Sequence, residues 1–426
     1  MYRFSLQNRN QNSITKIKNK RAKTLYSSTL KPVLLSLRVV GVHVPKDIWL
    51  CRYSDGIWSL SIMLFRFLYL GQELTSVILG LSPTHLLDQI AVILATISAC
   101  LASAFLAHDV LNMSRVLDQL DSTLQNMVWK QQNLRSVSHQ ILILTTIGWV
   151  YILLRWISML LILDNMPEHH FQSVFFGIVP NNLSTTAIYV FVSIIWSMEI
   201  FFIHGAIVFI PILFMSFCIL LRKSYREHNN IINELNSLPI LVTDFSSIRS
   251  FHEKLCSIVA KVDTIFGKIV FFWYLFLLVT VCLDITQLFT DETLLKNEAK
   301  NDVFYFSLRV LYSMLSFLGT CITASGVSLE AHAALPTVHN LTLHGLRLDM
   351  DNKLEAQFLI SRLTAPTIGL SGWNFFTINR SFILQVTAAL TTYVVIVIQL
   401  NPQAMRVIQH LVDQSVNSTN NATASE

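Results

Sequence analysis

The sequence has 426 residues, of which 53% are hydrophobic and 13% are charged, with a formal net charge of +5 and a mean hydropathy of +0.52. A soluble domain carries about 25% charged residues, so this composition excludes an ordinary water-soluble protein. The apolar segments are continuous rather than alternating, which favours an all-α polytopic membrane protein over a β-barrel.

The first part of the chain, residues 1–55, is basic and mostly polar, and we interpret it as a cytosolic segment. It contains no short apolar core followed by small residues at a cleavage position, so we expect no cleavable signal peptide. Its run "KIKNKRAK", at residues 16–23, can contact anionic membrane lipid. A solvated signal for membrane orientation is the simpler interpretation of that run.

Seven apolar runs follow, each long enough to cross a hydrocarbon core of about 30 Å as a helix. In chain order they lie at residues 56–80, 89–111, 141–164, 186–221, 267–289, 303–329 and 373–400. The fourth and sixth runs are longer than a span requires, so we expect these helices to tilt or to project beyond the membrane. Together the runs define a seven-helix transmembrane domain at residues 56–400.

The lysines and arginines outside these runs are distributed asymmetrically. If the N-terminus is cytosolic, the extracellular segments hold only Lys296, Lys300 and Arg406. The positive-inside rule therefore predicts a cytosolic N-terminus and an extracellular C-terminus, with residues 401–426 as an extracellular polar tail. Candidate glycosylation sites on the extracellular side are Asn182, Asn417 and Asn421.

Two long segments on the cytosolic side, residues 222–266 and 330–372, carry apolar side chains among charges. In the first segment the apolar positions recur at helical spacing, at Ile248, Phe251, Leu255, Ile258, Val259 and Val262. We predict helices that continue below the membrane into a cytosolic bundle, with loosely amphipathic loops as the alternative. No internal repeat indicates a transporter with two related halves.

The sequence lacks the signatures of several other classes of protein. Its six cysteines lie in apolar runs or in segments predicted to be cytosolic, so we expect no structural disulfide. We find no CxxC pair, no Gly-rich phosphate loop and no Ser/His/Asp set on connected loops. We therefore expect no metal, no cofactor, no nucleic-acid partner and no enzyme activity.

The last apolar run has one face that is smaller and more polar than its surroundings. On a helix, Gln385, Ala389, Thr392, Ile396 and Gln399 fall on a single stripe, because they are spaced alternately four and three residues apart. One interpretation is helix packing, since small and polar residues let membrane helices approach one another. The other is a pore wall, in which several copies of the stripe surround one axis and Ile396 forms an apolar ring.

Residues 392–399, "TYVVIVIQ", form the pattern TYhhhhhQ, where h is hydrophobic, through Thr392, Tyr393 and Gln399. This pattern resembles the signature of the insect and arthropod gustatory receptor family, which is related to insect odorant receptors. The preceding "GWNFFTINRSFILQVTAAL" is similar to the segment that leads into the last helix in that family. The N-terminal "LKPVLLSLRVVGVHVP" is similar to the family's segment just before the first membrane helix.

This resemblance implies a ligand-gated, non-selective cation channel that assembles as a homo- or hetero-tetramer. The last helix of each subunit then lines the pore, with Ile396 at the hydrophobic gate, Gln399 as the pore amide and Leu400 beside the constriction. The extensions of the later helices form a cytosolic bundle that joins subunits. A small-molecule ligand enters a pocket in the outer half of helices 2 to 6.

Polar and aromatic residues of that outer half are candidates for contacting the ligand. They are Trp156, Tyr189, Trp196, Asp284, Gln287, Tyr305 and Arg309. Aromatic faces with a few polar groups suit sugars or amphipathic alkaloids, although aromatic residues near span ends also form interfacial belts. Ionisable groups inside spans are costly and therefore indicate pairing or function, and Asp284 and Arg309 both lie in the outer half, where they can pair. Glu199 and His204 form a possible second polar cluster.

These observations predict a chemosensory receptor channel subunit in the plasma membrane of sensory neurons, responding to a sugar, a bitter compound or another small tastant. A light- or peroxide-sensing member of the same family is the alternative, with Trp156, Trp196 and Trp273 as the first residues to test. A G-protein-coupled receptor is disfavoured because the charge bias places the N-terminus inside. The chain also lacks Asp-Arg-Tyr after the third span and NPxxY in the last.

Overall fold

The computed structural model describes residues 29–43, 54–79, 86–125, 131–163, 185–235, 245–290, 300–344, 350–364 and 368–400. These parts of the chain are almost entirely helical, which confirms the predicted all-α class. The labelled helices are α2 (Ser54–Ile78), α3 (Leu86–His108), α4 (Val110–Gln125), α5 (Gln131–Leu163), α7 (Thr185–Glu199), the π-helix η3 (Ile200–His204), α8 (Gly205–Leu235), α9 (Phe245–Thr290), α11 (Lys300–His332), α12 (Leu335–His344), α13 (Met350–Thr364) and α14 (Arg380–Leu400).

Six helical segments in the described residues are long and apolar enough to cross a membrane. They are Leu86–His108, Arg135–Ile162, Tyr189–Asn233, Phe245–Phe289, Val303–Thr342 and Arg380–Leu400. The first predicted span, residues 56–80, lies on α2, which is a helix but is not among the six. Arg66 and Glu73 lie within α2 and lower its mean hydropathy.

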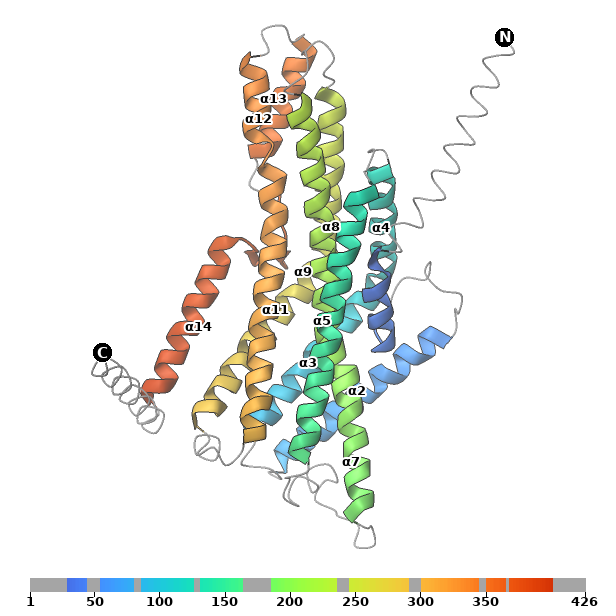
Figure 1. The fold of residues 1–426 in the computed structure, drawn as a ribbon, viewed down its shortest axis with the longest axis vertical. Helices are drawn as coiled ribbons and strands as arrows, with labels where there is room; N and C mark the ends of the chain where they lie inside the picture. The colour runs from blue at the N-terminus through green and yellow to red at the C-terminus, as the bar shows by residue number, and fades with distance from the viewer. Residues whose placement is uncertain are drawn as a thin grey trace, which may run out of the picture.

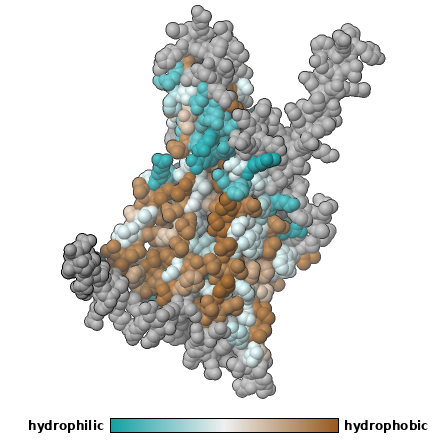
Figure 2. All heavy atoms as spheres, in the orientation of Figure 1, coloured by the Kyte–Doolittle hydropathy of each residue, from teal (hydrophilic) through white to brown (hydrophobic). Residues whose placement is uncertain are grey.

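The long helices α5, α8, α9 and α11 form the body of the molecule, with α12 and α13 at one end (Figure 1). Hydrophobic side chains cover the half of the surface away from α12 and α13, and hydrophilic side chains gather toward those helices (Figure 2). The body has one large apolar core, to which one face of the helix at residues 29–39 contributes Leu30, Val33 and Leu37. A surface with one apolar zone and one polar zone suits a membrane protein with helices that extend into water.

The helical extensions enclose a second, separate core at the α12 and α13 end. Its members are Ile232, Phe245, Ala334, Val338, Leu341, Ala356, Leu359 and Leu363. Residues 245–266 belong to the continuous helix α9, and Leu255 and Val262 in this part are fully buried. The alternative of loosely amphipathic loops is therefore wrong for this segment, because its apolar face has helices to pack against.

The predicted last span, residues 373–400, is wrong at its start. Helix α14 begins only at Arg380, and a two-stranded antiparallel hairpin, β1 (Ser371–Gly372) and β2 (Phe376–Thr377), precedes it. Trp373 and Asn374 adopt positive φ values of 48° and 59°, which makes a tight turn that a helix does not allow. The Asn379 Oδ1 atom accepts a hydrogen bond from the Phe382 backbone N–H at 2.8 Å and caps the new helix start.

The hairpin is attached to α9. The Asp263 carboxylate accepts hydrogen bonds from the Ser371 backbone N–H at 2.6 Å and from the Ser371 hydroxyl at 2.9 Å. A Cβ atom on Gly267 would lie 3.3 Å from the Trp373 backbone nitrogen, so glycine permits the close approach. The start of α14 is therefore fixed to the middle of α9.

Candidate functional site

Helix α14 stands at the side of the bundle, where one of its faces packs on α9 and α11 (Figure 1). None of its residues is fully buried. The side chains predicted to line a pore are all exposed in the single chain: Gln385, Ala389, Thr392, Ile396, Gln399 and Leu400. Ile396 is 46% exposed, whereas Ile398 on the packed side is half-buried. Packing within this chain therefore does not account for the small and polar stripe.

The signature tyrosine lies on the packed side of α14 rather than on the stripe. The Tyr393 hydroxyl lies 2.6 Å from the Thr286 Oγ1 atom and donates to the Cys282 carbonyl at 3.2 Å. Both partners belong to α9. Tyr393 thus connects the last helix to the same helix that holds the hairpin at Asp263.

Replacing this tyrosine by phenylalanine tests the connection. Tyr393→Phe keeps the ring and removes the hydroxyl, so we expect a loss of about 1 kcal/mol in the free energy of unfolding. The measurement is the thermal unfolding midpoint of the purified protein. Thr391→Val is the control, because Thr391 is exposed and donates only to the Thr387 carbonyl of its own helix. An unchanged midpoint in Tyr393→Phe would contradict the connection.

A buried ionic group joins α3, α9 and α11. The Arg309 Nε atom donates to Asp284 Oδ2 at 2.8 Å, and a second guanidinium nitrogen contacts the other Asp284 oxygen. The third nitrogen donates to Asp88 at 2.7 Å. The predicted pairing of Asp284 with Arg309 is thus confirmed, and the structure adds Asp88 as a second carboxylate. Buried charges need such partners, because an unpaired charge loses its hydration without compensation.

A second polar group lies beside the first. Arg155 on α5 is 1% exposed and donates to the Tyr305 hydroxyl at 2.8 Å, with its guanidinium 4.7 Å from the Tyr305 ring centre. It also lies 3.1 Å from His204, which in turn lies 3.4 Å from Glu199. The predicted cluster of Glu199 and His204 therefore exists. Arg155 and Tyr305 connect this cluster to Arg309, since the Arg309 guanidinium lies 5.6 Å from the Tyr305 ring centre.

A small cavity of about 60 Å³ lies next to these charges, between α3, α5, α8, α9 and α11. Side chains that line it include Tyr151, His204, Trp273, Arg309 and Tyr312. Of the seven predicted ligand contacts, Arg309 lines the cavity. The other six, which do not line it, are Trp156, Tyr189, Trp196, Asp284, Gln287 and Tyr305.

Those other candidates have different surroundings. Asp284 accepts hydrogen bonds from Arg309, and Tyr305 accepts one from Arg155, next to the cavity. The Trp156 indole N–H donates to the Ser197 hydroxyl at 2.9 Å, and Trp196 packs against the main core. Gln287 is 4% exposed and its Oε1 atom has no hydrogen-bond partner. Aromatic and polar composition alone did not distinguish these positions from the cavity lining.

The sequence contains a signal that could have found the cavity. Ala91, Ala95 and Ser98 all line it from α3, and their spacing of four and three residues places them on one helix face. Small side chains on one face leave space where the neighbouring helices carry large ones. Tyr151 on α5, Trp273 on α9 and their neighbours fill part of that space.

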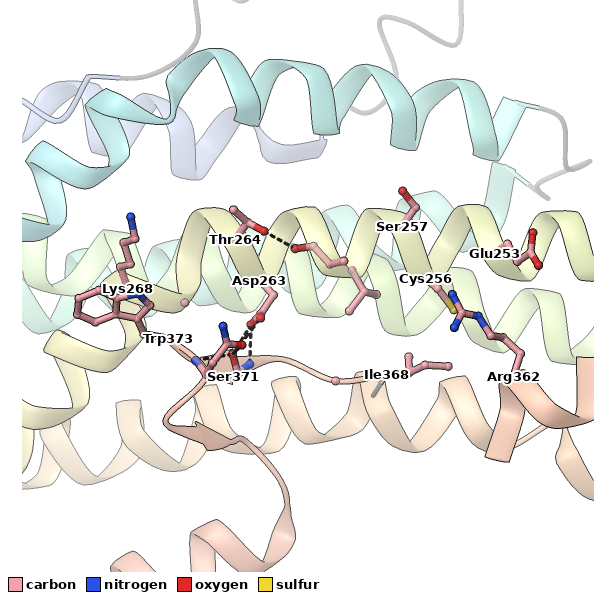
Figure 3. A pocket seen from close by; sticks show the side chains of 15 residues that line it. Glu253, Cys256, Ser257, Asp263, Thr264, Lys268, Arg362, Ile368, Ser371 and Trp373 are labelled. Atoms are coloured by element: carbon pink, nitrogen blue, oxygen red, sulfur yellow. Dashed lines mark hydrogen bonds between the residues drawn. The ribbon is translucent and has the colours of Figure 1, made fainter. Parts of the chain in front are cut away.

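A larger groove of about 620 Å³ lies elsewhere, between α9 and the segment that joins α13 to α14 (Figure 3). Asp263 and Ser371 face each other across its floor, and Cys256 and Arg362 lie toward its other end (Figure 3). It contains none of the predicted ligand contacts. The buried ionic groups and an aromatic wall are at the smaller cavity, which we take as the candidate ligand site.

Three further features lie outside the cavity and the pore helix. Arg66 on α2 is fully buried and donates to the Phe202 carbonyl at 2.7 Å and to the Ser103 hydroxyl at 2.7 Å. Within the described ranges, no group of three or more His, Cys, Asp or Glu side chains can hold a metal ion. The glycosylation candidates Asn182, Asn417 and Asn421 lie outside the described residues.

Long apolar helices that hold a buried ionic network between them define a polytopic helical membrane protein. A family model described as "Trehalose receptor" matches residues 62–407 of the chain. The match covers most of the sequence, so the chain belongs to this family of insect gustatory receptors. It is a chemosensory transmembrane receptor, and the family is not one of enzymes. Among curated proteins, none matches the sequence.

Solved structures share the fold. The olfactory receptor OR5 from Machilis hrabei in complex with eugenol is similar with a TM-score of 0.71 and 16% identity, covering 89% of this chain and 100% of that one. A second structure of the same receptor, whose description names no ligand, gives a TM-score of 0.69 and 17% identity. It covers 87% of this chain and 98% of that one. At this level of identity the likeness establishes a common fold.

Proposed function

We propose that this protein is a subunit of a ligand-gated, non-selective cation channel, and that α14 lines the pore. The observation that carries the proposal is the exposed stripe of Gln385, Thr392, Ile396 and Gln399 on a mainly apolar helix. Membrane helices turn amide and hydroxyl side chains toward protein or water rather than toward lipid. A pore filled with water and lined by copies of this stripe gives these side chains such an environment.

One helix cannot enclose a pore, so the proposal requires several subunits around a common axis. We propose a homo- or hetero-tetramer, as in the resemblance described above. In this assembly Ile396 forms an apolar ring that closes the pore by excluding water, and Gln399 forms a polar ring beside it. Monovalent and divalent cations are the permeant ions.

We propose a membrane topology in which α2 is a seventh span, although it carries charges. The two terminal nitrogens of Arg66 donate to carbonyl and hydroxyl groups inside the bundle, so its charge does not face lipid. The N-terminus is then cytosolic, and α12, α13 and the ends of α8 and α9 form a cytosolic bundle. The receptor acts in the plasma membrane of sensory neurons.

The cavity between α3, α5, α8, α9 and α11 is the proposed ligand site, on the basis of its aromatic wall and its adjacent ionic network. The olfactory receptor of similar fold was solved in complex with eugenol, a small molecule. Helix α9 links the cavity to the pore helix, because it carries Trp273 in the cavity wall and Thr286 beside Tyr393. A ligand that shifts α9 therefore acts on both the hairpin and α14.

Accessibility of introduced cysteines tests the pore assignment. In a background that conducts, we expect a charged thiol reagent to block current through Thr392→Cys and Gln399→Cys, because both positions face the water-filled axis. Val386→Cys and Val397→Cys are matched controls on the packed side, where both residues are half-buried. Block at the control positions, or at neither set, would overturn the assignment of this face to the pore.

A further inference from the structure

Lys268 and Arg380 lie at one border of the apolar zone. Lys268 is the last charged residue of α9 before Asp284, since residues 269–283 carry no charge. Arg380 is the first residue of α14, and residues 381–400 carry no charge. The surface changes from hydrophilic to hydrophobic near the level at which α14 begins (Figures 1 and 2). In the topology proposed above, both cations therefore lie at the cytosolic border of the membrane.

The hairpin of β1 and β2 connects the two helices at this border. It leads into the start of α14 at Arg380. On its other side the turn residue Trp373 approaches the backbone of Gly267, which is the neighbour of Lys268 in α9. Lys268 and Trp373 both line the large groove, at the end where Figure 3 shows them together. The two cations therefore flank one small structural element.

This hairpin exposes two aromatic rings. Trp373 is 43% exposed and Phe375 is 71% exposed. Phe271 of α9 packs against both, with its ring centre 4.9 Å from that of Phe375 and 5.9 Å from that of Trp373. These contacts hold the rings at the surface rather than in the core. Aromatic side chains are enriched at the border between membrane and water, where a ring contacts the level of the lipid headgroups.

The two cations have no counter-charge from the chain. Within the residues that the structure describes, neither Lys268 nor Arg380 makes a hydrogen bond or an ion pair. The two carboxylates of the groove are engaged elsewhere, because Glu253 pairs with Arg249 and Asp263 binds the hairpin. Arg380 also lies at the N-terminus of α14, where the helix dipole disfavours a positive charge. An anion from outside the chain would therefore be stabilised at this position.

On the basis of the proposed topology, we propose that Lys268, Arg380 and the hairpin form a binding site for an anionic phospholipid of the cytosolic leaflet. The two cations bind the phosphate group, and Trp373 and Phe375 contact the glycerol and acyl region. The cytosolic leaflet carries anionic lipids, and the long stems of Lys and Arg let the charge reach a headgroup while the stem stays on apolar surface. Because the hairpin is bonded to α9 and leads into α14, the bound lipid stabilises the start of the proposed pore helix.

Two short-chain lipids with identical acyl chains test the site. Dioctanoyl phosphatidylglycerol is anionic, whereas dioctanoyl phosphatidylcholine is zwitterionic. The thermal unfolding midpoint of the purified full chain in non-ionic detergent, followed against lipid concentration, gives the apparent affinity. We expect phosphatidylglycerol to bind at least about fivefold more tightly than phosphatidylcholine. The double variant Lys268→Gln with Arg380→Gln should lose this preference.

The matched control is the double variant Lys254→Gln with Lys353→Gln. It also removes two exposed positive charges, and residues 254–268 span about 21 Å of helix, so Lys254 lies far from the hairpin. This control should keep the preference. A preference that survives in the variant of Lys268 and Arg380, or that falls equally in the control, overturns the site. Inorganic phosphate at the same concentrations tests a soluble anion, and a midpoint shift equal to that of phosphatidylglycerol overturns the assignment to a lipid.

The aromatic contact is tested by Phe375→Ser. This change should weaken the binding of both lipids and keep the preference for the anionic one, because the ring contacts the part that the two lipids share. Phe304→Ser is the control, since Phe304 is 49% exposed near the start of α11, away from the hairpin, and should leave both affinities unchanged. Equal affinities in Phe375→Ser and in the wild type would overturn the contact with the ring.

Separate measurements distinguish a failure of this site from a failure of the proposed function. A basal cation current through Ile396→Ala supports the channel whatever the lipids do. If Ile396→Ala is silent but the preference holds, the channel proposal fails and the lipid site stands. Lys353→Cys tests the leaflet, because an impermeant thiol reagent should not label it from outside intact cells. Labelling above the wild-type level would place this end of the molecule outside and overturn the cytosolic leaflet.

Discussion

Cells that express Ile396→Ala should pass a cation current with no ligand added, at least about tenfold larger than the basal current of the wild type. A ring of isoleucines closes a narrow pore because its apolar surface excludes water. Truncation to alanine widens the ring and lowers the cost of wetting it. A tenfold shift toward the open state requires only about 1.4 kcal/mol, which is less than the transfer free energy of one buried isoleucine side chain. The measurement is whole-cell patch clamp, and it needs no knowledge of the ligand.

Ile398→Ala is the matched control for this experiment. It makes the same truncation two residues away, on the half-buried side of α14, and should leave the basal current low. Surface labelling must show both variants at the wild-type level. If Ile396→Ala is at the surface and silent, the stripe is a packing face for another membrane helix and does not line the pore. If both variants leak equally, truncation loosens α14 as a whole, and Ile396 is not the gate.

The features that sequence predicted well are those that depend on local composition. The long apolar runs predicted helices long enough to cross a membrane. The pair of Asp284 and Arg309 was predicted because ionisable groups in apolar runs need partners. The stripe on α14 was predicted because helical spacing alone places its residues on one face. Its exposure in the single chain follows from the same geometry, since Tyr393 points the other way toward α9.

The features that sequence did not predict depend on contacts between distant segments. The hairpin before α14 requires positive φ at Trp373 and Asn374, and neither residue is glycine. Its position is fixed by Asp263, more than a hundred residues earlier in the chain. The cavity lining depends on which face each of several helices turns inward. Apolar runs that are buried on many sides carry little periodic signal for this choice.

The largest effect on stability is expected at the buried ionic group. In Arg309→Leu the Asp284 side chain, which has no exposed surface, loses its partner on α11. An uncompensated buried charge costs about 3–5 kcal/mol, so this variant should unfold at a much lower temperature and accumulate poorly at the cell surface. Asp284→Asn should be milder, because Arg309 keeps its 2.7 Å bond to Asp88. Thermal unfolding of the purified proteins and surface labelling measure both variants.

A double variant separates two contributions to the free energy of unfolding: the penalty of leaving Asp284 without a partner, and the net stabilisation by the Asp284–Arg309 pair. Arg309→Leu combined with Asp284→Leu removes both charges and fills the space with apolar groups, so it should recover most of the stability that Arg309→Leu loses. The control is Arg226→Leu, which breaks the ion pair with Glu330 near the second core and should cost at most about 1 kcal/mol, since Arg226 is largely exposed. Recovery in the double variant would mean that Arg309 is needed mainly to neutralise Asp284. A double variant as unstable as Arg309→Leu would mean instead that the Arg309 guanidinium holds α3, α9 and α11 together, through its bond to Asp88 and its contacts with the Tyr305 and Phe306 rings. The ionic group would then fix the shape of the cavity.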